Sequence, residues 1–336
     1  MAHRIPFIDA RIPLLDEKSI ERRIEAREDR GKVRSLISQG PFARARKIHA
    51  WLMARSGLAH LKSDQIKMLE PLKNGVRLAG LDDVHAADLV AAELHAEMPW
   101  MAPATRAAWR SLRLAALRGE PARVPPLLLV GPPGIGKSAW ARQLAERIGV
   151  PSVVIEATNE PAGFAVSGLQ AGWSSASPGK PLLAILRNRI GNPLVVVDEV
   201  EKAGRVTSNS GTPYDLAGAM LPLLERSTAK RWSCPFFRVG FDMSHIGWVL
   251  TANSLAGVPE PFMDRCRVIR LGPVQHAELV AFARRQAKRV GLSEEIAGAI
   301  VGALNRMGPA GEALSLRVVM RMIEEGEVIE GLPTVH

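Results

Sequence analysis

The sequence has few cysteines, few aromatic residues and no long apolar run. Its 336 residues include two cysteines, Cys234 and Cys266, with no Cys-x-x-Cys pair, which argues against a disulfide scaffold or a structural zinc site. Aromatic residues make up 5% of the chain, too few to indicate a base-stacking platform. No run approaches the ~20 consecutive apolar residues of a membrane helix, and charges interrupt the first residues, where a signal peptide would be apolar. We therefore expect a cytoplasmic protein with no membrane partner.

Positive charge is concentrated at the start of the chain. Residues 1–62 contain 14 lysines and arginines against 7 aspartates and glutamates, so they contribute +7 of the net +10. Helical patterns cover residues 14–36 and 43–58. We interpret residues 1–78 as a basic helical N-terminal extension that docks a partner or a neighbouring subunit. A nucleic-acid partner for this extension is an open alternative, because lysine and arginine neutralise phosphates.

Short runs of branched residues alternate with helical windows in the middle of the chain. Continuous apolar runs of four or five residues are typical of parallel strands buried on both faces. An alanine-rich helical pattern over 81–118 precedes them, and three helical patterns follow, at 275–289, 293–306 and 313–325. The sequence thus predicts an α/β domain over 79–272, with a five-stranded parallel sheet and flanking helices, and a helical lid subdomain over 273–336. The five predicted strands are 126–130, 152–156, 194–198, 247–251 and 267–271.

The most specific motif follows the first predicted strand and precedes a helical window. It fits the phosphate-loop pattern G-x-x-x-x-G-K-[ST]. Such a loop turns backbone N–H groups toward phosphate oxygens, its lysine reaches the β- and γ-phosphates, and its last hydroxyl binds Mg²⁺. The motif therefore predicts a site for ATP and Mg²⁺. Its residues are Gly131, Pro132, Pro133, Gly134, Ile135, Gly136, Lys137 and Ser138.

A second acidic motif ends the third predicted strand, where Leu194-Val-Val-Val is followed by Asp198 and Glu199. Asp198 suits a contact to Mg²⁺ or its water, and Glu199 suits the base that polarises an attacking water. An acidic strand end at the surface is the ordinary alternative. That alternative loses weight because the phosphate loop belongs to the same predicted sheet.

These two motifs, with two later ones, resemble the AAA+ ATPases, a family of P-loop NTPases, and in particular the ATPase module of Lon proteases. The later motifs are Thr251-Ala-Asn253-Ser at a strand end and the Pro-x-Pro segment that leads to Asp264-Arg265. The resemblance spans about residues 80–325. It implies that Asn253 is the sensor 1 amide that orients the lytic water and that Arg265 is an arginine finger entering a neighbouring subunit's site.

The same resemblance assigns sensor 2 to Arg317, with Arg321, one helical turn later, as the alternative. It also places a substrate pore loop at Trp173-Ser174, ahead of Pro178-Gly179. Packing of Trp173 against an adjacent domain or subunit remains the alternative there. Because little sequence follows the last predicted helix, we expect no protease domain and no peptidase activity in this chain.

The preferred function is a Mg²⁺-dependent ATPase that assembles as a homo-oligomeric, hexameric ring and remodels or translocates protein substrates. Two alternatives stay open. One is a motor or loader that works on nucleic acid through residues 1–62, and the other is a scaffold or switch controlled by nucleotide.

Overall fold

The computed structural model describes residues 3–10, 12, 17–30, 40–158, 162–170, 176–203, 206–207, 213–214, 216–307 and 315–331. A parallel five-stranded sheet lies at its centre, in the order β11-β3-β10-β5-β4. Each predicted strand belongs to this sheet, which confirms the predicted fold class. The strands are β3 (Leu127–Val130), β4 (Ser152–Glu156), β5 (Leu194–Asp198), β10 (Gly247–Ala252) and β11 (Arg267–Arg270).

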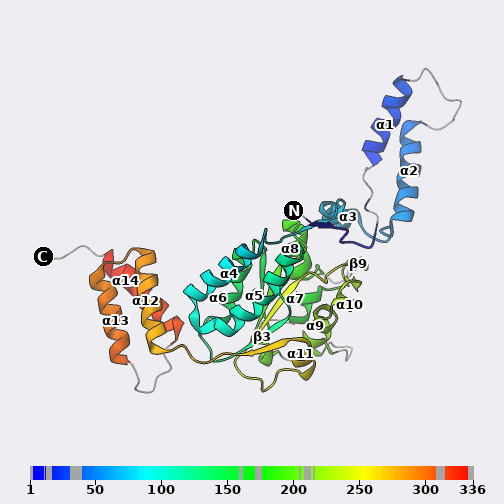
Figure 1. Cartoon of the computed structure of the whole chain (residues 1–336). Coiled ribbons are helices and arrows are strands. Elements are labelled where there is room, and N and C mark those ends of the chain that lie inside the picture. Colours follow the sequence, from blue (N-terminus) through cyan, green and yellow to red (C-terminus); the bar gives the residue numbers. More distant parts are fainter. Residues whose placement is uncertain are drawn as a thin grey trace.

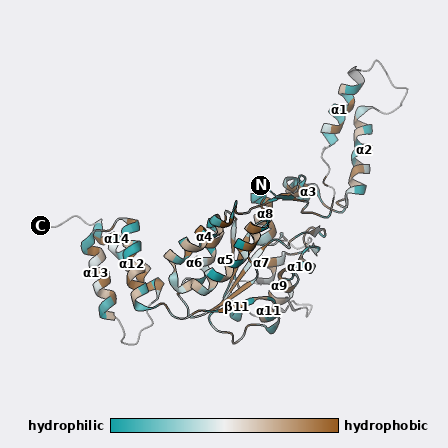
Figure 2. Cartoon of the chain, in the orientation of Figure 1, coloured by the Kyte–Doolittle hydropathy of each residue, from teal (hydrophilic) through white to brown (hydrophobic). Residues whose placement is uncertain are grey.

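Both faces of the sheet are covered, as the uninterrupted apolar runs predict. Leu128 and Val130 of β3 point into one apolar cluster, and Leu127 and Leu129 into the other. The first cluster contains side chains of α7 (Ala162–Ser167), α8 (Lys180–Asn188) and α9 (Leu216–Leu224). The second contains α6 (Lys137–Arg147) and the helices before β3. Figure 2 shows hydrophobic residues gathered in these central strands and helices.

Several short elements fill the long connections around β10. They are an α10 turn (Arg226–Ala229), the α11 helix (Glu260–Arg265), and two antiparallel pairs, β6 (Val206–Thr207) with β7 (Pro213–Tyr214) and β8 (Trp232–Ser233) with β9 (Gly240–Phe241).

The helical region predicted at 81–118 consists of two helices. The first, α4 (Val84–Glu97), begins at Asp83, whose side chain accepts the Ala86 N–H at 2.7 Å. It ends just before the turn Pro99–Met101, because a proline disfavours helical geometry in the residue before it. The second, α5 (Ala102–Leu117), packs along α4, and both Trp109 and Arg113 donate to Asp88.

The first 78 residues are only partly a helical extension. Two helices, α1 (Glu17–Arg30) and α2 (Pro41–Ser56), form a hairpin that projects from the body (Figure 1). The residues around the hairpin are built into the body instead. The strand β1 (His3–Ile5) pairs with β2 (Val76–Leu78), and α3 (Ser63–Leu69) lies between the hairpin and β2.

Core packing explains this difference from the prediction. Phe7 is 1% exposed and lies 5.7 Å from the Phe241 ring, measured between centroids. Leu58 and Leu72 are buried in the same cluster as Val195 of the central sheet. Single apolar residues separated by polar ones carry no clear strand or helix periodicity, so the sequence pattern does not reveal this contact. A domain boundary at residue 78 would therefore divide this apolar core between two domains.

Three helices follow the sheet: α12 (His276–Val290), α13 (Glu294–Met307) and α14 (Leu316–Glu330). They form a unit beside the body in Figure 1. Trp100 joins the two parts, since its Nε1 donates to the Ile135 carbonyl at 2.8 Å and its ring meets Phe282 edge-on at 6.0 Å. The unit is thereby tied to the phosphate loop. Among the described helices, none has both the length and the apolar content needed to cross a bilayer.

Candidate active site

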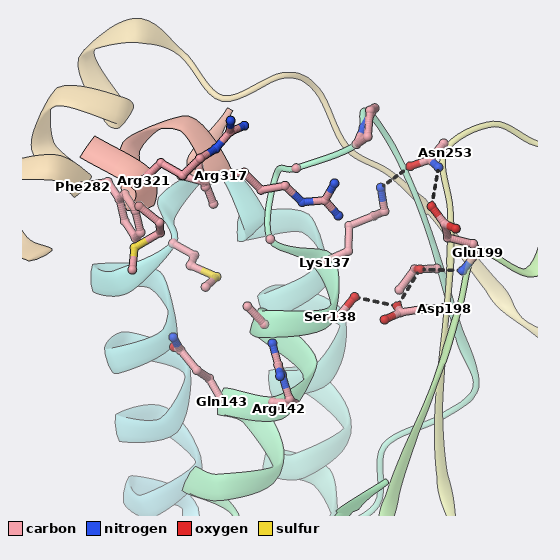
Figure 3. Close-up of a pocket in the computed structure, with 18 of the residues that line it drawn as sticks. Lys137, Ser138, Arg142, Gln143, Asp198, Glu199, Asn253, Phe282, Arg317 and Arg321 are labelled. Carbon is pink, nitrogen blue, oxygen red and sulfur yellow. Dashed lines mark hydrogen bonds between the residues drawn. The ribbon is translucent and has the colours of Figure 1, made fainter. Parts of the chain in front are cut away.

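The phosphate loop lies at the carboxyl end of β3 and leads directly into α6 (Figure 3). Gly134 and Gly136 have φ values of +75° and +87°, in the left-handed region that favours glycine. A Cβ on Gly134 would lie 2.8 Å from the Ser315 Cβ, so a larger residue would also collide with the start of α14. The loop is therefore shaped both by its own backbone and by the three-helix unit.

Lys137 is the most buried charged residue of this site, at 7% exposure. Its Nζ donates to the carbonyls of Gly131 (2.7 Å) and Pro132 (3.0 Å) and to Oδ1 of Asn253 (3.1 Å). Burial lowers its pKa, while the negative charges of Glu201 and Asp198 act in the opposite direction. Phosphate oxygens carry negative charge, so they attract the Lys137 ammonium more strongly than these neutral acceptors do.

A hydroxyl and a carboxylate meet beside the lysine. Ser138 Oγ donates to Asp198 Oδ1 at 2.5 Å, and Thr251 Oγ1 donates to the same oxygen at 2.9 Å. Hydroxyl and carboxylate oxygens are the hard ligands that Mg²⁺ prefers, usually with phosphate oxygens completing its shell. Ser138 and Asp198 therefore fit the binding of Mg²⁺ together with a nucleotide.

Glu199 has an unusual backbone for a non-glycine residue, with φ 58° and ψ 47°. Its N–H donates to Thr251 Oγ1 at 3.2 Å. Its Oε1 accepts from Lys202 Nζ at 3.0 Å and from Asn253 Nδ2 at 3.5 Å. The hydrogen bond from Lys202 is the main cause that lowers the pKa of Glu199. An ionised carboxylate at this position can accept a proton from water.

Three polar residues of this network were missed by the sequence analysis. Thr251 links Asp198 to the Glu199 backbone, and Lys202 pairs with the Glu199 carboxylate. Glu201 Oε1 accepts the Asn253 N–H at 3.0 Å. Thr251 belongs to the Thr-x-Asn-Ser motif and could have been noted there. The contacts of Lys202 and Glu201 depend on how the turn after β5 folds against the end of β10. The spacing of residues in the sequence does not reveal this fold.

The cleft extends from the loop to α14 and has a volume of ≈ 1000 Å³. Both Arg317 and Arg321 line it. In Figure 3 the guanidinium of Arg317 extends toward Lys137, whereas that of Arg321 ends farther from it. The charge of Arg317 is also among the causes that lower the pKa of Lys137 and of Glu199. The structure therefore favours Arg317 over Arg321 as the arginine that acts on this site.

The predicted arginine finger and the predicted pore loop have different outcomes. Arg265 ends α11 outside the cleft lining, where its Nε is 4.0 Å from a Glu225 carboxylate oxygen. Trp173 and Ser174 lie outside the described residues. Next to them, Gly168 and Pro178 form an antiparallel bridge, which brings the two ends of that connection together.

The sheet order, the loop geometry and the Asp-Glu pair together define a P-loop nucleoside triphosphatase. Residues 127–274 match the family model of the "ATPase family associated with various cellular activities (AAA)". These residues therefore match an AAA ATPase domain, a class of domain that binds ATP together with Mg²⁺ and hydrolyses it.

Curated relatives agree with this assignment, and a solved structure shares the fold. The Lon protease of Magnetococcus marinus is 31% identical over 220 residues, which are 60% of this chain and 27% of that protein. The Lon protease of Treponema pallidum is 34% identical over 159 residues, which are 47% of this chain and 18% of that protein. The chain thus spans about a quarter or less of the length of these relatives. A chain of Saccharomyces cerevisiae Hsp104 in its extended complex with casein shares the fold, with a TM-score of 0.55 at 13% identity over 92% of this chain and 58% of that chain.

Proposed function

We propose that this chain is a Mg²⁺-dependent ATPase that assembles into a ring and uses ATP hydrolysis to remodel or translocate protein. The observation that carries the proposal is one connected polar network at the end of the sheet. Lys137, Asn253 and Glu199 form one branch of it, and Ser138 and Asp198 the other. Together these branches provide a cation that can bind phosphate, ligands for a metal ion and a base, all within one cleft.

In the hydrolysis step, Lys137 binds the β- and γ-phosphates and stabilises the charge that develops on them. Ser138 and Asp198 would hold Mg²⁺, which would neutralise phosphate charge. Glu199 accepts a proton from the attacking water, and Asn253 orients that water. Lys202 pairs with the Glu199 carboxylate and lowers its pKa, and this carboxylate is ionised at neutral pH, as a glutamate ordinarily is.

A ring accounts for the position of Arg265. The Arg265 side chain is not part of the cleft lining of its own chain and is 37% exposed. We assign it to the site of the neighbouring copy, where a cation beside the γ-phosphate accelerates hydrolysis. Arg317, on the three-helix unit of the same chain, is the proposed sensor that couples the nucleotide to the movement of α14.

The similar proteins support a protein substrate. The similar proteins include Lon proteases and an Hsp104 chain in complex with casein. Trp173 is proposed to grip the threaded protein by dispersion and apolar contact, which are tolerant of sequence. The motifs of residues 127–274 concern nucleotide chemistry, and we assign them no role in peptide-bond cleavage.

The direct test measures the ATPase rate of the full chain alone, with an unfolded protein, and with DNA or RNA at two salt concentrations. Stimulation by unfolded protein supports the proposal. Stimulation by nucleic acid that weakens strongly with salt would instead support the second candidate, which rests on the five basic and no acidic residues in 40–62. No stimulation by either would favour a scaffold or switch.

A further inference from the structure

The projecting helix α2 exposes an apolar and basic stripe along one side. Ile48 and Trp51 are 43% and 57% exposed, although both are large apolar residues. Lys47 and Arg55 lie at the two ends of this stripe and are exposed, and the Arg55 guanidinium stacks 4.8 Å from the centroid of the Trp51 ring. The spacing of three, four and eight residues places them on one helical face. We call Lys47, Ile48, Trp51 and Arg55 the α2 stripe.

A groove with the opposite charge lies between α13 and α14. Its volume is ≈ 1020 Å³, above the ~300–1,000 Å³ typical of small-molecule pockets, and it can hold several side chains of one helix. Its lining includes Ile296 and Ile300, which approach Gly326 closely enough that a Cβ there would lie 3.0 and 3.3 Å from their methyl groups. Glycine at 326 therefore lets α14 lie close to α13 at the floor of the groove.

The charges around this groove are mainly acidic. Its lining contains Glu295, Glu325 and Glu330 against a single basic residue, Arg321. Glu330 already accepts the Ser293 N–H at 2.9 Å, whereas Glu295 and Glu325 are exposed on the two helices. We call this site the lid groove. An apolar floor with acidic sides complements an apolar stripe with basic ends.

We propose that the α2 stripe of one copy docks into the lid groove of a neighbouring copy of this chain. Figure 1 places the α1–α2 hairpin and the α12–α14 unit at opposite ends of the molecule, so the contact joins different copies. Such a head-to-tail contact uses two different surfaces and repeats from copy to copy, which produces either a closed ring or a filament. The inference rests on the proposed function only in that the copies close into a ring.

The test uses two full-length variants that invert one surface each. The stripe variant is Lys47→Glu/Arg55→Glu, and the groove variant is Glu295→Lys/Glu325→Lys. Each variant alone faces like charges across the contact, so its self-association constant should fall by about tenfold or more. An equimolar mixture restores opposite charges at every contact, because the acidic stripe meets the basic groove and the basic stripe meets the acidic groove. Sedimentation velocity should therefore show reassembly in the mixture.

Two further variants sharpen the measurement. Trp51→Ala should weaken association without changing any charge. Arg46→Glu is the matched control, since it reverses an exposed charge on the opposite side of α2 and should leave the sedimentation profile unchanged.

The inference is wrong if each inverted variant assembles like the wild type, if the mixture stays dissociated, or if the wild type is a monomer at every concentration. It is also wrong if the stripe variant loses binding to a labelled DNA oligonucleotide while its assembly is unchanged, because the occupant is then nucleic acid. None of these outcomes depends on ATP hydrolysis. Failure of the proposed ATPase appears separately, as an inactive wild type.

Discussion

Thr251 holds the two carboxylates of the active site in place, and its replacement by valine isolates that role. The side chain is 2% exposed, donates to Asp198 at 2.9 Å and accepts from the Glu199 N–H at 3.2 Å. Valine has nearly the same shape and makes neither hydrogen bond. A hydrogen bond to a charged group contributes about 1.5–3 kcal/mol, and an unsatisfied N–H costs about 1–3 kcal/mol.

The two losses sum to about 2.5–6 kcal/mol, which is the expected fall in the free energy of unfolding of Thr251→Val. If about half of the lost interaction positions Asp198 and Glu199 in the transition state, kcat should fall by about 10- to 100-fold, since each ~1.4 kcal/mol is tenfold. The assay is steady-state ATP hydrolysis with Mg²⁺, with KM measured separately. Thr251→Ser keeps the hydroxyl and should retain most of kcat. A folded Thr251→Val protein with kcat within about twofold of wild type would refute the positioning role.

Three other predictions concern the base, the neighbouring copy and the threading loop. Lys202→Met should raise the pKa of Glu199, because it removes the main cause that lowers it, and so move the acid limb of kcat/KM to higher pH. Mixing Arg265→Ala with Lys137→Ala chains should restore part of the hydrolysis that each lacks alone, because mixed interfaces pair an intact loop with an intact arginine. Trp173→Ala should keep ATP binding and assembly and lose work on an unfolded protein, measured as substrate unfolding per ATP hydrolysed.

Each of these has a control or an opposing result. Lys202→Arg keeps the cation and should keep the pH profile, and an unshifted profile in Lys202→Met would contradict the ion-pair argument. No recovery in rings shown to contain both variants would contradict the trans role of Arg265. A Trp173→Ala chain that melts at a lower temperature and dissociates would show that Trp173 is a packing residue, since loss of a buried tryptophan costs ~3–5 kcal/mol.

The sheet and the principal motifs were predictable because their signals are local. Strands buried on both faces give uninterrupted apolar runs, and the loop at 131–138 is specified by glycines and a lysine at fixed spacing. The break at Pro99 could also have been read from the sequence, since proline interrupts a helix.

The remaining features depend on contacts between distant segments. Phe7 reaches Phe241, and Trp100 reaches both Ile135 and Phe282, through tertiary packing with no periodic signal. The partners of Glu199 were hidden for a similar reason. The register of β5 against β10 and the left-handed turn at Glu199 determine which residue after β5 contacts the end of β10.

The central claim is that this network binds ATP through Lys137 and hydrolyses it with Glu199. The most direct measurement is Mg²⁺-ATP binding by calorimetry together with phosphate release, for wild type, Lys137→Ala and Glu199→Gln. The account predicts binding and turnover in wild type, binding without turnover in Glu199→Gln, and neither in Lys137→Ala. Equal ATP affinity in wild type and Lys137→Ala, or undiminished turnover in Glu199→Gln, would contradict it.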